Sequence, residues 1–209
     1  MTFSLDLPTG PLAESALALV RSSESAAIAN HSLRSFFFAQ LLAAHDGCEQ
    51  DAAYDRGLLF AATVMHDLGT GALAKGEDRF EVEGADLAAA VLREHRVCES
   101  DVDRVWEAIA LHTSPGIARR RGLLAHLTRE GVGADFGQNA EIVAAWVPRI
   151  VAAYPRLMMV RSLVDAIVER AARSPAAGPR YSIGGELLRE RQAGGITSME
   201  LAVASTPWE

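Results

Sequence analysis

Three of the six histidines in this sequence of 209 residues lie in strongly apolar segments. They are His31, His66 and His112, and each has apolar residues at helical spacing around it. His66 is followed directly by Asp67 in the segment VMHDLGTG. Imidazole nitrogens and carboxylate oxygens are ligands of divalent transition metals. A metal site is therefore the first chemical hypothesis that these residues raise.

Adjacent residues of a helix point about 100° apart, so His66 and Asp67 can reach one ion only if it lies just beyond the helix end. Two ligands would leave a divalent cation mostly hydrated, so other segments must contribute. His31 is one candidate, and an acid from a later segment should be another. Asp135, in the apolar segment VGADFG, is our choice, and Asp165, in RSLVDAIVER, is its rival.

The elements that must position these side chains are helices. Apolar residues recur at three- and four-residue spacing, and alternating strand-like runs are almost absent, which predicts an all-α protein. We expect helices over about residues 11–21, 26–45, 51–67, 79–95, 101–114, 122–131 and 148–173. The segment GVGADFG follows the sixth helix, and Pro155 should kink or break the last one. We expect residues 10–173 to form one helical domain, and residues 174–209 to be a C-terminal extension packed on it.

Composition restricts the partners. The chain carries 20 basic and 27 acidic residues, a formal net charge of −7, which argues against binding to nucleic acid or to an anionic membrane. No window approaches the roughly 18 apolar residues of a membrane span, and the first residues show no leader pattern. These features predict a cytoplasmic protein with a small-molecule substrate, and they are compatible with a homo-oligomer.

The order of His31, the His66–Asp67 pair and a distant aspartate on a helical body resembles the HD-domain superfamily of metal-dependent hydrolases. The segments NHSLRSFFFA, VMHDLGTG, RFEVEGADLAA, EAIALHTSPGIA and GVGADFG, in that order, are similar to its cyanamide hydratase-like branch over about residues 10–150. The resemblance implies an HD-type helical bundle with the metal site between helices. By position it implies metal ligands at His31, His66, Asp67 and Asp135.

Two departures from related families bear on the substrate. Many phosphohydrolase HD proteins carry a lysine three residues after the aspartate, where this chain has Thr70. The GYP signature of cyclic-dinucleotide phosphodiesterases and the Glu-Asp pair of guanosine tetraphosphate hydrolases have no counterpart. Phosphoryl transfer is therefore the less favoured chemistry. Among the metals that suit such ligands, namely zinc, iron, manganese, nickel and cobalt, zinc best fits the resemblance.

The leading hypothesis is a hydrolase or hydratase in which activated water attacks a small cyanamide- or nitrile-like compound. Asp67 and His112 would be catalytic, with His112 supplying or relaying a proton. Candidates for substrate contact, or for support of the ligands, are Arg34, Thr70, Glu81 and Thr113; the family block FExxG suggests Glu81, and Arg34 could instead form a structural ion pair.

Two alternatives remain open. One is an HD-type phosphohydrolase acting on a nucleotide or phosphoester, which predicts a basic cluster over the site. The candidate basic residues for such a cluster are Arg34, Lys75 and Arg79, and Lys75 is the only lysine of the chain. The other alternative is a ligand-binding HD module without turnover.

Overall fold

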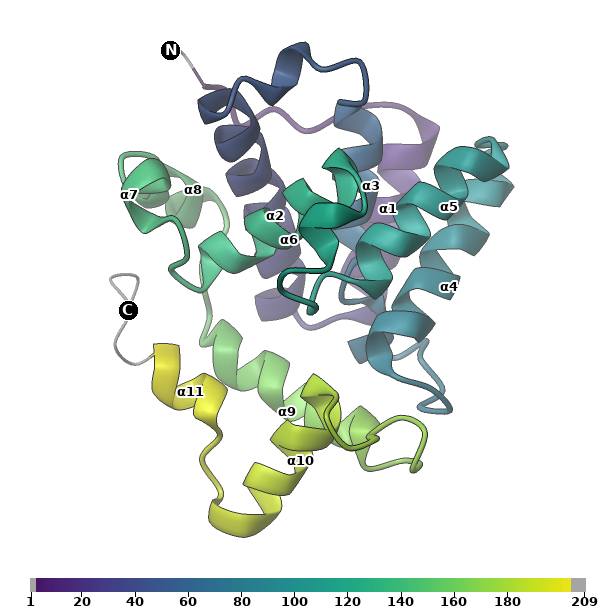
Figure 1. Cartoon of the computed structure of the whole chain (residues 1–209), viewed down its shortest axis with the longest axis vertical. Helices are drawn as coiled ribbons and strands as arrows, with labels where there is room; N and C mark the ends of the chain where they lie inside the picture. The colour runs from purple at the N-terminus through teal and green to yellow at the C-terminus, as the bar shows by residue number, and fades with distance from the viewer. Residues whose placement is uncertain (1–2, 204–209) are drawn as a thin grey trace.

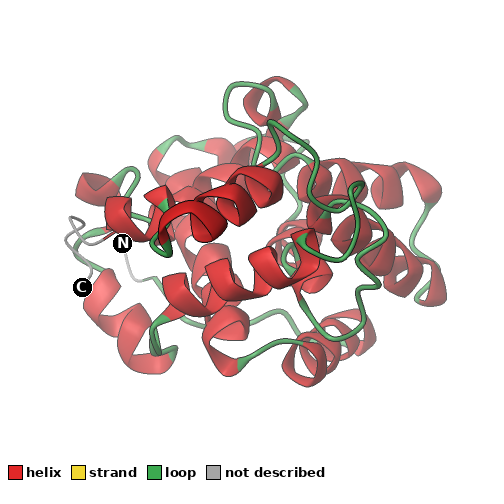
Figure 2. Cartoon of the chain, turned by 90° about the horizontal axis from the view of Figure 1, so that it is seen from below, coloured by secondary structure: helices red, strands yellow, loops and turns green. Residues whose placement is uncertain are grey.

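All regular structure is helical in residues 3–203, the part of the chain that this computed structural model describes (Figures 1 and 2). The prediction of an all-α protein is confirmed. The first six α-helices are Pro11–Ser23 (α1), Ala26–His45 (α2), Arg56–Met65 (α3), Phe80–Glu94 (α4), Glu99–Ala110 (α5) and Leu123–Asp135 (α6). The others are Ala140–Val143 (α7), Val147–Ala153 (α8), Met159–Ala171 (α9), Ile183–Gly194 (α10) and Ser198–Val203 (α11). Short 3-10 helices span Cys48–Gln50 (η1), Leu68–Thr70 (η2) and Ala118–Arg120 (η3).

Helix α2 is the central element of the fold. It begins after Ser25, whose hydroxyl accepts a hydrogen bond from the Ile28 amide at 3.4 Å. Nearly every side chain from Ala27 to Ala43 is buried, because α2 contacts α3, α6 and α9 on different sides. A helix surrounded in this way can hold polar groups such as His31 and Arg34 away from solvent.

Helix α6 lies against α2 at a position where only glycine fits. A Cβ atom on Gly131 would collide with the carbonyl oxygen of Ser35 and the side chain of Ala39, both on α2. The helix continues through Gly131 and Gly133 as far as Asp135, so our expected end near residue 131 was too early. Packing against α2 outweighs the modest cost of glycine inside a helix.

This close approach can be tested by adding one methyl group. We expect Gly131→Ala to lower the free energy of unfolding by about 1–3 kcal/mol, because the backbone of α2 or α6 must move. The control is Gly194→Ala in α10, where a Cβ would have no neighbour within 4 Å. That change should be neutral or gain up to about 1 kcal/mol. Denaturant unfolding measures both, and equal effects would contradict the close packing of α2 and α6.

The ends of two helices place the candidate site residues. Helix α3 begins after Asp55, whose carboxylate accepts hydrogen bonds from two backbone amides, rather than near residue 51 as expected. It ends at Met65, so His66 and Asp67 follow its last turn directly. Helix α5 ends at Ala110, and His112 lies two residues beyond. The backbone leaves the helical conformation at Asp67 and at Leu111, beside His66 and His112, so these side chains can turn toward α2.

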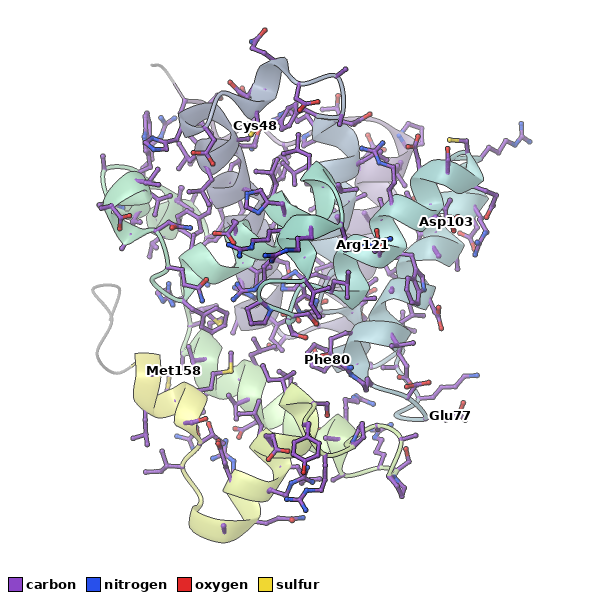
Figure 3. The ribbon with its side chains drawn as sticks, in the orientation of Figure 1. Cys48, Glu77, Phe80, Asp103, Arg121 and Met158 are labelled. Atoms are coloured by element: carbon purple, nitrogen blue, oxygen red, sulfur yellow. The ribbon has the colours of Figure 1, made fainter. Side chains whose placement is uncertain are left out.

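The C-terminal helices form a layer below the body of the molecule (Figure 1). Pro155 separates α8 from α9, as expected. Helix α9 contacts α2 and α4 on one side and carries α10 and α11 on the other. Figure 3 shows Phe80, at the start of α4, between the body and this layer, and its side chain joins a buried apolar cluster with residues of α9 such as Leu163. The division into a domain of residues 10–173 and an extension of residues 174–209 stays a prediction.

No helix in the described part of the chain is long and apolar enough to cross a membrane.

Candidate metal centre

Three histidines converge on the carboxylate of Asp67. The Nε2 atom of His66 lies 3.1 Å from Asp67 Oδ2, and that of His31 lies 3.8 Å from the same oxygen. The Nε2 atom of His112 lies 3.8 Å from Asp67 Oδ1. All four residues are buried. Possible ligand atoms of His31, His66 and Asp67 all lie within 4.8 Å of one another, which is close enough to hold one metal ion.

The Nδ1 atom of each histidine is already engaged, and this fixes the orientation of the ring. The Nδ1 of His66 is 2.7 Å from the carbonyl oxygen of Thr63, and that of His112 is 2.6 Å from the carbonyl oxygen of Ile109. A carbonyl oxygen can only accept, so Nδ1 carries the proton and donates it. The Nδ1 of His31 is likewise 2.7 Å from Asp135 Oδ2. In the neutral imidazole, the lone pair is then on Nε2, the atom that faces Asp67.

Several of these converging atoms have no hydrogen-bond partner in residues 3–203. They are the Nε2 atoms of His31 and His66 and the Oδ2 atom of Asp67. Buried polar groups without partners are costly, and lone pairs that face one another repel. A divalent cation between them would satisfy all three atoms, so the residues present fit a metal ion.

The charges of the site follow from burial and mutual contact. Burial alone would raise the pKa of Asp67, but neighbouring His66 holds this pKa well below its usual range. Burial lowers the pKa of His31 from its usual value and lowers the pKa of His112 to about 4. Burial opposes protonation of His66 too, but the charge of Asp67 outweighs it and raises the pKa. The site thus presents an ionised carboxylate and favours neutral imidazoles at His31 and His112, and a bound metal would take the place of a proton on His66.

Asp135 lies behind His31 rather than beside Asp67. Its Oδ2 accepts hydrogen bonds from His31 Nδ1 and from Arg34 Nη2, both at 2.7 Å. Its Oδ1 accepts hydrogen bonds from Arg34 Nε at 2.8 Å and from Arg156 Nη1 at 2.9 Å. Burial would raise the pKa of Asp135, but these partners keep it well below its usual range. The structure therefore brings Asp135 to the far edge of the His31 ring and engages both of its oxygens.

Asp165 and Arg34 lie in different surroundings. Asp165, the rival of Asp135, is on the exposed side of α9 and accepts a hydrogen bond from Arg191 at 2.8 Å. Arg34 is fully buried, and besides Asp135 it donates to the carbonyl oxygen of Tyr154 at 2.9 Å. Arg34 thus locks a carboxylate near the site and does not line the cavity described below.

Three further candidates, Thr70, Glu81 and Thr113, lie near the centre, but their side chains do not point at the carboxylate of Asp67 as the three histidines do. The hydroxyl of Thr70 donates to the carbonyl oxygen of Asp67 at 2.8 Å and so fixes its backbone. Thr113 donates at 2.7 Å to Glu81 Oε1, which also receives a hydrogen bond from Arg79 at 2.7 Å. Glu81 is buried, so this contact holds Thr113 next to His112.

Glu24, which the sequence did not single out, is a buried carboxyl group near this centre. Both of its oxygens are buried and lack a hydrogen-bond partner within residues 3–203. Burial, helped by the charge of Asp67, raises the pKa of Glu24 well above its usual value. No local pattern singles it out, because a glutamate in the connection between two helices normally faces solvent.

The converging atoms form the polar end of a cavity of about 280 Å³. His31, His66, Asp67 and His112 line this end, and Thr113 lies beside them. The C-terminal extension also contributes to the lining. The remaining lining residues are mostly apolar and come from α4, from α6 and the turn that follows it, and from α9–α11. They are Phe80, Val132, Gly133, Phe136, Leu163, Ile167, Ile183, Met199 and Ala202, with the polar Arg129 and Gln138. Sequence patterns did not single out Arg129 or Gln138.

The HD domain family matches residues 28–170, more than half of the chain and the segment that contains all the candidate ligands. The chain therefore belongs to the HD domain family. Members of this family are generally metal-dependent hydrolases, and the His/His/Asp group fits a divalent metal. No curated protein matches the chain, so the cyanamide hydratase-like branch stays a prediction.

Proposed function

We propose that this protein is a metal-dependent hydrolase or hydratase whose divalent ion is held by His31, His66 and Asp67. The observation that carries this proposal is the set of buried, unpartnered ligand atoms at the end of a cavity. We assign Asp135 to the positioning of His31, in place of the ligand role that the resemblance implies, because its oxygens are taken by Arg34, Arg156 and His31 Nδ1. A hydrogen-bonded carboxylate behind a ligating histidine fixes its tautomer and ring orientation.

The metal, for which zinc is our choice, would supply Lewis-acid activation of water at neutral pH. The chain itself handles the proton. His112 Nε2 faces the cavity with its lone pair, because Nδ1 donates to Ile109, so it can accept a proton from water and return it to the substrate. Thr113, held by Glu81, lies beside it as a second polar contact.

The substrate class that we propose is a small compound with an electrophilic carbon bonded to nitrogen, such as a nitrile or a cyanamide. In hydration of a nitrile, the water oxygen bonds to carbon and both water protons end on nitrogen, which gives an amide. The apolar walls and the small volume support a small molecule with an apolar portion. The cytoplasmic location, the lack of a nucleic-acid partner and the homo-oligomer stay predictions.

A phosphohydrolase is the second candidate. The observation that favours it is Arg129, a cation in the cavity wall that could meet a phosphate. Against it, no lysine lines this cavity and the side chain of Thr70 is turned to the backbone of Asp67. A binding module without turnover would keep the same geometry, so only activity separates it from an enzyme.

Metal analysis and a substrate screen test the proposal. We expect the purified protein, supplied with zinc, iron, manganese, nickel or cobalt, to retain close to one equivalent of one of them. Cyanamide and small nitriles should be turned over, and phosphomonoesters and nucleotides should not. Less than about a tenth of an equivalent of every metal would refute the metal site; phosphate release alone would establish the second candidate, and metal binding without any turnover the third.

A further inference from the structure

Arg129 is a cation without a counter-ion in the cavity wall. It lies on α6 in a stripe with Val132, Gly133 and Phe136, all of which line the cavity. Its guanidinium makes no hydrogen bond and no ion pair within residues 3–203, and its Nε atom is buried without a partner. Arg34 and Arg156, by contrast, are both bound to Asp135. A partly buried guanidinium lacking an acid is a ready partner for an anion that enters from outside.

The side chain of Gln138 lies next to that of Arg129, and both pass over Gly133, which has no side chain. A Cβ atom on Gly133 would collide with Oε1 of Gln138 at one side, and it would lie 2.6 Å from Nη1 of Arg129. The guanidinium and the amide therefore lie close together at Gly133. The Gln138 side chain is exposed at this position and also lines the cavity, so the pair lies where the cavity meets solvent. The guanidinium of Arg129 offers N–H donors, the Gln138 amide has its Oε1 atom against Gly133, and neither side chain carries a negative charge.

The pair is separated from the metal centre by an apolar wall. The ring of Phe136 packs against the ring of His31 with centroids 5.2 Å apart, at the centre itself. Arg129 precedes Phe136 by two turns of α6, or about 10 Å along the helix axis. Val132 lies between them on α6, and Leu163 and Ile167 of α9 line the same cavity. A ligand that touches both ends needs one reactive end, an apolar middle and an anionic end.

We propose that Arg129, beside Gln138, binds the carboxylate of a small organic acid whose carbon–nitrogen group lies toward Asp67. This inference rests on the proposed function and narrows its substrate class. A planar carboxylate matches the fork of one guanidinium, whereas a phosphate carries more charge than one arginine neutralises. Apolar walls and the volume of about 280 Å³ suit a short aliphatic or aromatic acid.

Calorimetric titration of the metal-loaded protein with butanoate, butanamide and inorganic phosphate tests the carboxylate site. We expect butanoate to bind more tightly than butanamide and phosphate, and Arg129→Met to weaken butanoate binding by about ten- to a hundredfold. Butanamide binding should not change. Arg129→Lys should recover part of the affinity, because it keeps the charge and loses the fork. The matched control is Arg119→Met, an exposed arginine outside the cavity, which should bind as the unaltered protein does.

Each other result overturns the inference. If butanoate and butanamide bind equally tightly, the protein has no site for a carboxylate. If phosphate binds more tightly than butanoate, the site is one for phosphate. If butanoate binding is lost when the metal is removed but is unchanged in Arg129→Met, the carboxylate binds to the metal and not to Arg129. Circular dichroism confirms that each variant is folded, and Gln138→Leu provides a second variant at an exposed position. Metal content is measured on the same samples, so failure of the metal site is seen separately from failure of the anion site.

Discussion

Asp67→Asn is expected to remove metal binding and to lower the turnover of any carbon–nitrogen substrate by about a thousandfold or more, since the Lewis acid contributes several kcal/mol to the barrier. Asp67 is the residue on which all three histidines converge, at 3.1 Å from His66 and 3.8 Å from both His31 and His112. An amide keeps the shape of the carboxylate and loses its charge. Metal content and kcat/KM, measured on the same preparation, check the expectation.

The control for this change is Asp165→Asn. Asp165 is exposed and pairs only with arginines on the protein surface, so its loss should alter neither metal content nor activity. If Asp67→Asn keeps a full equivalent of metal and loses activity, the carboxylate acts on the proton rather than on the ion. If the variant keeps both its metal and its activity, the metal is not bound at Asp67.

Local signals accounted for much of the fold. The bounds of α2 were predicted to the residue, because Ser25 is a strong N-cap and His45 is followed by Asp-Gly. Pro155 marked the break before α9, as proline removes a donor and restricts the residue before it. The position of the His66–Asp67 pair at the end of a helix also followed from sequence, since two glycines come shortly after it.

Contacts between distant segments were not predictable in this way. Whether Asp135 meets a metal or a histidine depends on the two arginines that reach it, and Arg156 directly follows Pro155, where only a kink or a break was expected. Arg129, in the segment LTREG, resembles an ordinary exposed charge on a helix. Its place in a cavity wall depends on α9–α11, which come from the other end of the chain and line the same cavity. Sequence periodicity does not predict which distant segments of the chain come together.

The arrangement around Asp135 leads to the second large expectation. We expect Asp135→Leu to lower the free energy of unfolding by about 3–5 kcal/mol, because Arg34 would be left as a buried, unpaired cation. Arg34→Met alone should also be destabilising, since the Asp135 carboxylate loses a bidentate partner. Denaturant unfolding of the metal-free protein measures this effect without any contribution from ligand binding.

The double variant Asp135→Leu with Arg34→Met separates stability from positioning. Replacing both members of a buried ion pair by apolar groups often costs little, so this variant should be more stable than either single one. His31 would nevertheless lose the acceptor of its Nδ1 proton, because only Asp135 holds it. We therefore expect metal affinity in the double variant to fall by about 10- to 100-fold while one equivalent is still bound at saturation. A site that binds no metal at any concentration would instead make Asp135 a ligand, and an unchanged affinity would show that His31 is held in place without it.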